Sequence, residues 1–387
     1  MKVQEKRKIF IFAGEESGDI RGAELIKALK KISPSLHIDA VGGEKMKAAG
    51  AHIIFDITGL AVVGFVEVLK HYTEFRKLMK NVVEILSQEN YSAIILIDYP
   101  GFNLRLAKRI RHLQLSVIYY ISPQVWAWGK RRSREIACLV DKMIVLFDFE
   151  KDIYTSYGLE TTFVGHPMVD MISGFSPEDL KKRLHITEEE KLIGFLPGSR
   201  VKEVEKILPS MLDAIELYKE RQDYSPLRFI ISSARKDLKE IIQKMLEKRK
   251  SIENVTIYEG SVSHVLASSD IIVVASGTAT LQTCLFEKPM IVVYKVAFLT
   301  WAIAKILIKI PYIAMVNVVS GKKIVPELVQ WGMTGDRIMK ELTSYLQDDE
   351  YRVSVIQELH KVKERLGSGG AADKAARSIV EFIDRKK

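Results

Sequence analysis

Residues 8–19 read KIFIFAGEESGD, and they contain a complete strand-to-helix unit. The apolar run Lys8–Phe12 predicts a buried strand, and the glycines and acidic residues after it predict a tight turn. A helix then starts near Asp19, which we expect to be its N-cap. An apolar strand that enters a helix through a short turn is typical of the βαβ units that build parallel sheets.

The same unit recurs along the chain. Short runs of β-branched residues alternate with longer amphipathic segments, and a long helix is predicted over residues 201–220. The further predicted strands are Ala93–Ile97, Val117–Ile121 and Met143–Phe147, and after a restart of the pattern Leu192–Leu196, Leu227–Ile231, Val255–Tyr258, Ile271–Ala275 and Met290–Tyr294. We therefore predict an α/β fold with two Rossmann-like domains.

A break in this rhythm places the domain boundary. Residues 164–167 read VGHP and are followed by the polar stretch SPEDLKKRLHITEEEK at 176–191. We predict a first domain over residues 1–168 and a second over 169–360. The C-terminal helix, 361–387, is expected to pack back on the first domain.

Composition removes several classes of protein. The chain has 387 residues, 47% hydrophobic and 28% charged, which suits two globular domains with their own cores. Its two cysteines, Cys138 and Cys284, are far apart in sequence and form no metal-ligand spacing, which predicts a protein of a reducing cytosol. The first apolar run ends at Ala13 and is too short for a signal peptide.

The net charge of +9 admits several partners. Anionic lipid, phosphorylated substrates and nucleic acid all attract a basic protein. No nucleic-acid-binding motif is present in the sequence, so we do not expect nucleic acid as a partner.

Two apolar segments admit two interpretations. Gly59–His71 and Val296–Ile310 are shorter than the run of about 20 apolar residues that crosses a bilayer. Each is readily explained as a core helix of a large α/β protein. Alternatively, either helix lies in a membrane interface, with Trp301 at headgroup depth and Lys305 and Lys309 attracted to anionic lipid.

Polar residues follow the predicted strands of the first domain. The loop at residues 14–19 lacks the GxGxxG spacing and the P-loop lysine, and its acidic residues suit sugar hydroxyls better than a pyrophosphate. Asp98 directly follows a strand, where a general base would be placed, although it is equally a capping residue for the next helix. Gln124 and Trp126 lie in the SPQVWAW stretch after the next strand, where tryptophans serve either packing or the binding of a sugar face.

Two loops of the second domain favour a diphosphate. Gly198, Ser199 and Arg200 join a strand to a long helix, and Ser276, Gly277 and Thr278 open another helix. Free backbone amides at a helix N-terminus attract anions, and a guanidinium adds to that attraction. Since no Asp-x-Asp motif is near these loops, we expect Arg200 and the helix ends, not a metal ion, to meet the diphosphate charge. We also expect no cofactor.

Taken in order, the motifs GEESGDIRGAELI, VGFVEV, IDYPGFN, SPQVWAW, VGHP, FLPGSR and SGTATLQ resemble those of the bacterial lipid-A-disaccharide synthase family. The resemblance runs from about residue 9 to 330. It implies an inverting, metal-independent glycosyltransferase of the B type, with two Rossmann-like domains facing a central cleft. The implied donor is UDP-2,3-diacylglucosamine and the implied acceptor is the 6-hydroxyl of 2,3-diacylglucosamine 1-phosphate, which together give a β-1,6 disaccharide and UDP.

The resemblance also implies roles for residues. Asp98 would be the base and Arg200 would hold the UDP diphosphate. The implied sugar-binding residues are Glu15, Ser17, Gly18, Asp19, Asn103, Gln124 and Trp126. The implied nucleotide-binding residues are Gly198, Ser199, Arg200, Ser276, Gly277, Thr278, Gln282 and Asn317.

This chain departs from the family pattern at two places. Gln282 stands where the family has a glutamate that accepts hydrogen bonds from the ribose, so one acceptor remains but the charge is lost. Asn317 lies in Val316-Asn317-Val318 where the family has Pro-Asn-Leu. Acylated substrates imply a cytoplasmic protein at the anionic inner-membrane surface, and a homodimer is left open.

Two other functions remain possible on the sequence alone. One is a different UDP-sugar enzyme of the same fold, such as an epimerase, whose product would be an isomerised nucleotide sugar. The other is a non-catalytic membrane-bound protein that binds nucleotide sugars, which would show no turnover.

Overall fold

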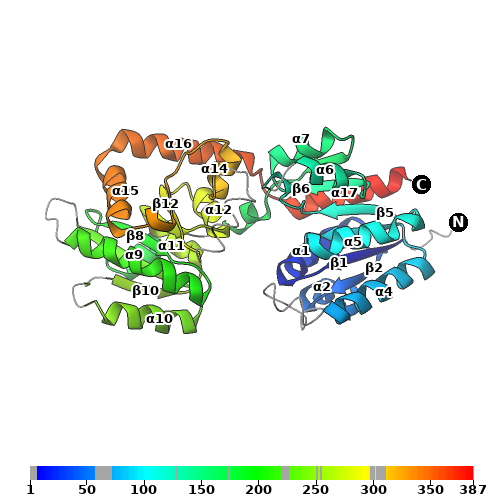
Figure 1. The fold of residues 1–387 in the computed structure, drawn as a ribbon, viewed down its shortest axis with the longest axis horizontal. Coiled ribbons are helices and arrows are strands. Elements are labelled where there is room, and N and C mark those ends of the chain that lie inside the picture. Colours follow the sequence, from blue (N-terminus) through cyan, green and yellow to red (C-terminus); the bar gives the residue numbers. More distant parts are fainter. Residues whose placement is uncertain are drawn as a thin grey trace. The chain divides into compact units, whose positions relative to one another are not determined.

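A computed structural model describes residues 7–56, 72–127, 130–172, 175, 177–219, 226–249, 252, 255–296, 301 and 311–386. The chain divides into two units, one formed by Met1–Pro167 with Ser368–Lys387 and the other by Met168–Gly367 (Figure 1). The predicted boundary at residue 360 was wrong, because it falls inside helix α16 (Asp349–Arg365) of the second unit. The segments Gly59–His71 and 302–310 lie outside the described residues.

Unit 1 contains a seven-stranded parallel sheet in the order β3-β2-β1-β4-β5-β6-β7. Its strands are β1 (Lys8–Ala13), β2 (His37–Gly42), β3 (His52–Asp56), β4 (Ala93–Ile97), β5 (Ser116–Tyr120), β6 (Lys142–Val145) and β7 (Glu160–Phe163). Its helices are α1 (Glu16–Ile32), α2 (Glu44–Ala48), α4 (Tyr72–Gln88), α5 (Pro100–Ile110), α6 (Lys130–Ala137), α7 (Asp148–Thr155) and α17 (Ala371–Arg385). All of β4 is buried, as expected for a central strand that is covered on both faces.

Unit 2 contains a six-stranded parallel sheet in the order β10-β9-β8-β11-β12-β13. Its strands are β8 (Lys191–Leu196), β9 (Leu227–Ser233), β10 (Val255–Glu259), β11 (Ile271–Ala275), β12 (Met290–Tyr294) and β13 (Glu327–Val329). Its helices are α8 (Pro177–Arg183), α9 (Val201–Lys219), α10 (Lys236–Glu247), α11 (Val262–Ser268), α12 (Thr278–Leu285), α14 (Met315–Ser320), α15 (Gly335–Gln347) and α16. The predicted α/β class with two Rossmann-like halves is confirmed.

Both sheets have a point at which the strand order reverses. In unit 1 this point lies between β1 and β4, and in unit 2 it lies between β8 and β11. The loops that leave two such strands turn away from each other and leave space at the carboxyl edge of the sheet, where ligands bind in open α/β folds. The order of the strands therefore marks one candidate site in each unit.

Helix α17 completes unit 1 although it is far from that unit in sequence. It packs against α1 (Figure 1). Ile379 is fully buried and Phe382 nearly so. The hydroxyl of Ser378 donates to Thr162 at 3.0 Å, and Arg385 reaches Glu160 of β7 at 2.5 Å. The last helix is therefore part of the core of unit 1.

We predict that Ile379→Ala destabilises unit 1. Truncating a buried isoleucine removes apolar contacts and leaves a cavity, which costs about 2–5 kcal/mol. Urea unfolding monitored by circular dichroism would show an earlier transition for unit 1. Glu381→Ala, an exposed change on the same helix, is the control, and equal unfolding curves for the two variants would contradict a core role of α17.

Candidate active site

The backbone at the end of β4 is strained, and hydrogen bonds hold Asp98 in place there. Asp98 and Tyr99 have φ values of 43° and 45°, a left-handed conformation that costs non-glycine residues about 1–3 kcal/mol each. The amide of Asn103 donates to the carbonyls of Ile97 at 3.0 Å and Asp98 at 2.7 Å. The hydroxyl of Tyr119 also donates to the Asp98 carbonyl, at 2.5 Å. Since α5 begins at Pro100 after Tyr99, Asp98 is not the N-cap of that helix.

The surroundings of Asp98 favour its protonated form. Burial raises the pKa of the Asp98 carboxyl from 3.8 to about 6, and the negative charge of Glu15 adds to the effect. Glu15 comes from the loop after β1, and β1 pairs directly with β4. A carboxylate whose pKa is close to neutral pH is suited to accept a proton from a substrate.

Gly14 allows the two loops to meet. A Cβ atom at position 14 would lie 2.1 Å from Cδ1 of Tyr99, so any side chain there would displace the Tyr99 ring. The hydroxyl of Ser17 donates to Glu15 at 2.6 Å, and both residues are exposed. Glu15, Ser17 and Asp98 thus lie at the point where the strand order of unit 1 reverses.

Three of the predicted sugar-binding residues have contacts within the protein. Helix α1 begins at Glu16, so Asp19 is not its N-cap; the buried Asp19 carboxylate instead accepts the backbone N–H groups of Gly43, Lys45 and Met46 at the start of α2. Gly18 is buried, and a Cβ atom there would lie 3.2 Å from that of Ala13. Asn103 is fully buried under the Asp98 loop. All three residues therefore contact the rest of the protein, and their place near the sugar stays a prediction.

The side chain of Trp126 is held by Glu150, a residue for which the sequence predicted no role. Its indole N–H donates to the buried Glu150 carboxylate at 3.1 Å, and its ring meets Phe149 edge to face. Burial raises the pKa of Glu150 to about 7. Trp126 is only partly buried and Gln124 is exposed, so both remain accessible at the carboxyl end of β5.

Unit 2 has a pocket of about 480 Å³ at its own reversal point. It is lined by seven of the predicted nucleotide-binding residues, namely Gly198, Ser199, Arg200, Ser276, Gly277, Thr278 and Gln282. The N-termini of α9 and α12 both open into it, which gives two sets of backbone amides for an anion. Ser232 and Gly260 also line it, and they were missed although each lies at or just after the end of a strand at the same edge.

Glu203 lines this pocket beside Ser199 and Arg200. Its carboxylate accepts the backbone N–H of Ser199 at 3.2 Å and pairs with the Arg200 guanidinium at 3.0 Å. Gly198 has a φ of 117°, and a Cβ atom there would lie 2.7 Å from the Glu203 carboxylate. The Arg200 side chain is 71% exposed, so it can swing from Glu203 to a bound anion.

Asn317 is not in this pocket. It is fully buried, its amide donates to Val325 and Glu327, and its carbonyl oxygen accepts the backbone N–H groups of Ile324 and Val325. Asn317 and Glu327 fix the chain between α14 and β13. The contact of Asn317 with the nucleotide stays a prediction.

Comparison with known proteins identifies the family. Residues 9–380 match the model of the lipid-A-disaccharide synthetase family. The chain is 37% identical over 366 residues to lipid-A-disaccharide synthase 1 of Legionella pneumophila strain Philadelphia 1, covering 94% of each chain. It is 35% identical over 382 residues to the lipid-A-disaccharide synthase of Geobacter metallireducens, covering 98% of each.

The chain belongs to the lipid-A-disaccharide synthase family. It is a glycosyltransferase of lipid A biosynthesis, as the sequence motifs predicted.

The fold is shared with more distant proteins. A putative UDP-N-acetylglucosamine 2-epimerase from Listeria monocytogenes superposes with a TM-score of 0.65 at 14% identity, covering 98% of each chain. A glycosyltransferase from Rickettsia africae gives a TM-score of 0.56, also at 14% identity and 98% coverage of each chain. These similarities show the B-type architecture, while the assignment to the synthase family rests on the closer relatives.

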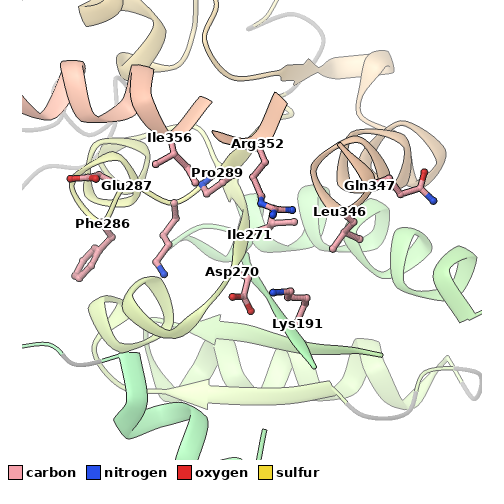
Figure 2. Close-up of a pocket in the computed structure, with 11 residues that line it drawn as sticks. Lys191, Asp270, Ile271, Phe286, Glu287, Pro289, Leu346, Gln347, Arg352 and Ile356 are labelled. Atoms are coloured by element: carbon pink, nitrogen blue, oxygen red, sulfur yellow. The ribbon is translucent and has the colours of Figure 1, made fainter. Parts of the chain in front are cut away.

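A second pocket of unit 2 lies at the opposite edge of its sheet. It has a volume of about 360 Å³, and Figure 2 shows Lys191, Asp270 and Arg352 among the residues around it. Asp270 pairs with Lys181 at 3.1 Å and accepts the backbone N–H of Leu192 at 2.8 Å. Its walls come from the amino ends of strands and from α15 and α16, and none of the predicted nucleotide-binding residues lines it.

We predict that Glu203→Gln strengthens the binding of UDP. The diphosphate must displace the Glu203 carboxylate from Ser199 and Arg200, and an amide competes less well for both groups. Exposed ion pairs are worth about 0.2–1 kcal/mol, which corresponds to a gain of up to about fivefold in affinity. Isothermal titration calorimetry with UDP measures the change. Glu205→Gln, on the exposed face of α9, is the control, and weaker binding by Glu203→Gln would contradict this role.

Proposed function

We propose that Asp98 is the general base of the transfer and that the pocket around Arg200 binds the UDP part of the donor. The donor is UDP-2,3-diacylglucosamine, the acceptor is 2,3-diacylglucosamine 1-phosphate, and the products are the β-1,6 disaccharide 1-phosphate and UDP. The observation that carries the proposal is the raised pKa of Asp98, on a strained loop at the switch point of unit 1.

The chemistry needs two groups. In an inverting transfer the acceptor 6-hydroxyl attacks the anomeric carbon on the face opposite UDP, and the base takes the hydroxyl proton as the new bond forms. Asp98 is suited to this step because its carboxylate accepts a proton near neutral pH. Glu15, Ser17, Gln124 and Trp126 remain as candidates to hold the sugar.

The departing UDP needs positive charge. Negative charge builds on the β-phosphate as the glycosidic bond breaks, and donors that are already oriented stabilise it most. Arg200 supplies a guanidinium, and the N-termini of α9 and α12 supply backbone amides. Gln282 lines the same pocket, where its amide can contact the ribose, although without the charge of a glutamate.

Substitution of Asp98 tests the proposal. Asp98→Asn keeps the size of the side chain and removes the base, so we expect kcat to fall by about 10²–10⁴. The assay supplies both acylated substrates in detergent micelles and detects disaccharide 1-phosphate and UDP by mass. UDP affinity, measured separately, should be unchanged, and unchanged turnover would contradict the role of Asp98. An isomerised nucleotide sugar as the product would instead indicate an epimerase.

The pH profile gives a sharper form of the same test. Activity should fall below a pH of about 6, because Asp98 is then protonated and cannot accept the hydroxyl proton. Glu15→Gln removes a nearby negative charge, lowers the pKa of Asp98 and should move the acidic limb to lower pH. Glu16→Gln, an exposed carboxylate that pairs with Lys45, is the matched control. If the acidic limb of the pH profile does not move in Glu15→Gln, the charge of Glu15 does not influence the pKa of Asp98.

We also propose that the enzyme associates with an anionic membrane surface at the cytoplasmic face of the inner membrane. In the part of the chain that the structure describes, no helix is long and apolar enough to cross a bilayer. Trp301 and Trp331 meet edge to face with ring centroids 5.0 Å apart, and Trp331 is 68% exposed. Tryptophans at a surface favour the headgroup region, and acylated substrates reside there.

Vesicle flotation tests this association. We expect Trp301→Ser and Trp331→Ser each to reduce flotation with vesicles that contain anionic lipid, because each removes apolar area from the interface. Tyr157→Ser is the control, since Tyr157 is an exposed aromatic residue of unit 1. If the tryptophan variants float as well as the unsubstituted protein, this pair does not contact the membrane.

A further inference from the structure

Three side chains with metal-binding atoms converge at the amino edge of the sheet in unit 1. His37 is the first residue of β2, His52 is the first residue of β3, and Asp39 is paired with His52 in the register of the two strands. His37 and Asp39 are two residues apart on one strand, so they share a face of the sheet. The cluster lies at the opposite end of the strands from Asp98.

The atoms have the spacing of ligands around one ion. Nε2 of His37 lies 3.0 Å from Oδ1 of Asp39, and Nδ1 of His52 lies 2.9 Å from the same oxygen. The ligand atoms of all three residues lie within 4.8 Å of one another. Bonds of about 2.0–2.1 Å from zinc to histidine nitrogen and carboxylate oxygen place adjacent ligand atoms about 3 Å apart. Small side-chain movements would therefore bring all three onto one ion.

The other carboxylate oxygen of Asp39 is bound by Tyr91 and Lys8. Oδ2 accepts the hydroxyl of the buried Tyr91 at 2.6 Å and pairs with Lys8 at 3.0 Å. Lys8 also pairs with Glu89 at 3.0 Å, so its charge is balanced locally. With neutral imidazoles, the Lys8, Asp39 and Glu89 side chains together carry one net negative charge. Partners behind a ligand that fix its orientation are typical of metal sites.

The open side of the cluster faces solvent. His37 and His52 have side chains that are 50% and 68% exposed, whereas Asp39 is only 4% exposed. A pocket of about 410 Å³ lies beside them and is also lined by Ile54, Ile85 and Gln88. An ion held by the three side chains would keep positions for water, and it would be reached without opening the fold.

We propose that His37, Asp39 and His52 form a binding site for one divalent transition-metal ion such as zinc, which ties the edge strand β3 to β2. Imidazole nitrogen and carboxylate oxygen together suit zinc, nickel and copper better than calcium or magnesium, which favour oxygen ligands alone. The site has no part in sugar transfer, and it stands independently of the function proposed for Asp98.

The test uses the full chain carrying Cys138→Ser, so that the exposed Cys138 thiol does not bind the metal. After treatment with a chelator, calorimetric titration with zinc chloride should show one site, and zinc should raise the melting temperature. Cobalt(II) gives a second readout, because its visible absorption reports nitrogen and oxygen ligands directly. His37→Ala and His52→Ala should each weaken zinc binding by about tenfold or more, as loss of a ligand requires.

His360→Ala is the matched control. His360 is also exposed and lies 3.2 Å from the Glu287 carboxylate, but that pairing provides only one imidazole and one carboxylate. Its substitution should leave zinc affinity and the melting shift unchanged. Transfer activity and UDP affinity should be the same in His52→Ala as in the parent, which also shows that this variant is folded.

Several outcomes would overturn the proposal. They are the absence of zinc binding, equal binding by the parent and both histidine variants, and loss of binding in His360→Ala. A small loss in each of the three histidine variants would indicate an adventitious ion only. If chelation abolished transfer activity and zinc restored it, the separation from catalysis would be wrong.

Discussion

Parallel pairing of every strand that the structure describes is the constraint on which the sites depend. In a parallel sheet all the carboxyl ends lie at one edge, and each is followed by a loop that enters a helix. That edge therefore gathers loops, helix N-termini and their free amides, whatever residues the loops contain. In unit 1 it gathers Glu15 and Asp98, and in unit 2 it gathers Ser199 and Thr278. The sequence has only to supply the appropriate side chain at a few positions.

Buried polar residues hold the loops and side chains of the candidate site in unit 1. Asn103 fixes the strained carbonyl of Asp98, Glu150 fixes the indole of Trp126, and Asp19 joins α1 to the start of α2. Each of these is buried, where an unsatisfied polar group is expensive, and each makes hydrogen bonds within the protein. Oδ1 of Asn103 is the one side-chain oxygen of the three residues that has no partner in the described part of the chain. A strained loop such as that at Asp98 persists only when the surrounding structure determines it in this way.

Much of the fold was predictable because periodicity reports burial. Strands such as Ala93–Ile97 and Ile271–Ala275 are continuous apolar runs and were found at their exact bounds. Strands β2, β3, β7 and β13 were missed because they are short or interrupted by polar residues, as β2 is by Asp39. In the candidate sites, Asp98 and the loops at Gly198 and Gly277 follow strands at the carboxyl edge of their sheets, as the sequence predicted, and their roles stay predictions. The hydrogen bonds of Asp19, Asn103 and Asn317 to the backbone were not predicted, since a sequence does not show the direction in which a polar side chain points.

The pKa of a carboxylate is shifted in opposite directions at the two edges of the unit 1 sheet. Burial alone raises the pKa of both Asp39 and Asp98, because each loses hydration. At Asp39, hydrogen bonds from Tyr91, His52 and Lys8 outweigh burial and lower the pKa to about 2. At Asp98, the charge of Glu15 adds to burial, and the pKa rises to about 6. Asp39 is therefore a permanent anion that stabilises the packing of β1, β2 and β3, whereas Asp98 can gain and lose a proton at the pH of a cell. The difference lies in the neighbours that each edge provides, since the residue type and the sheet are the same.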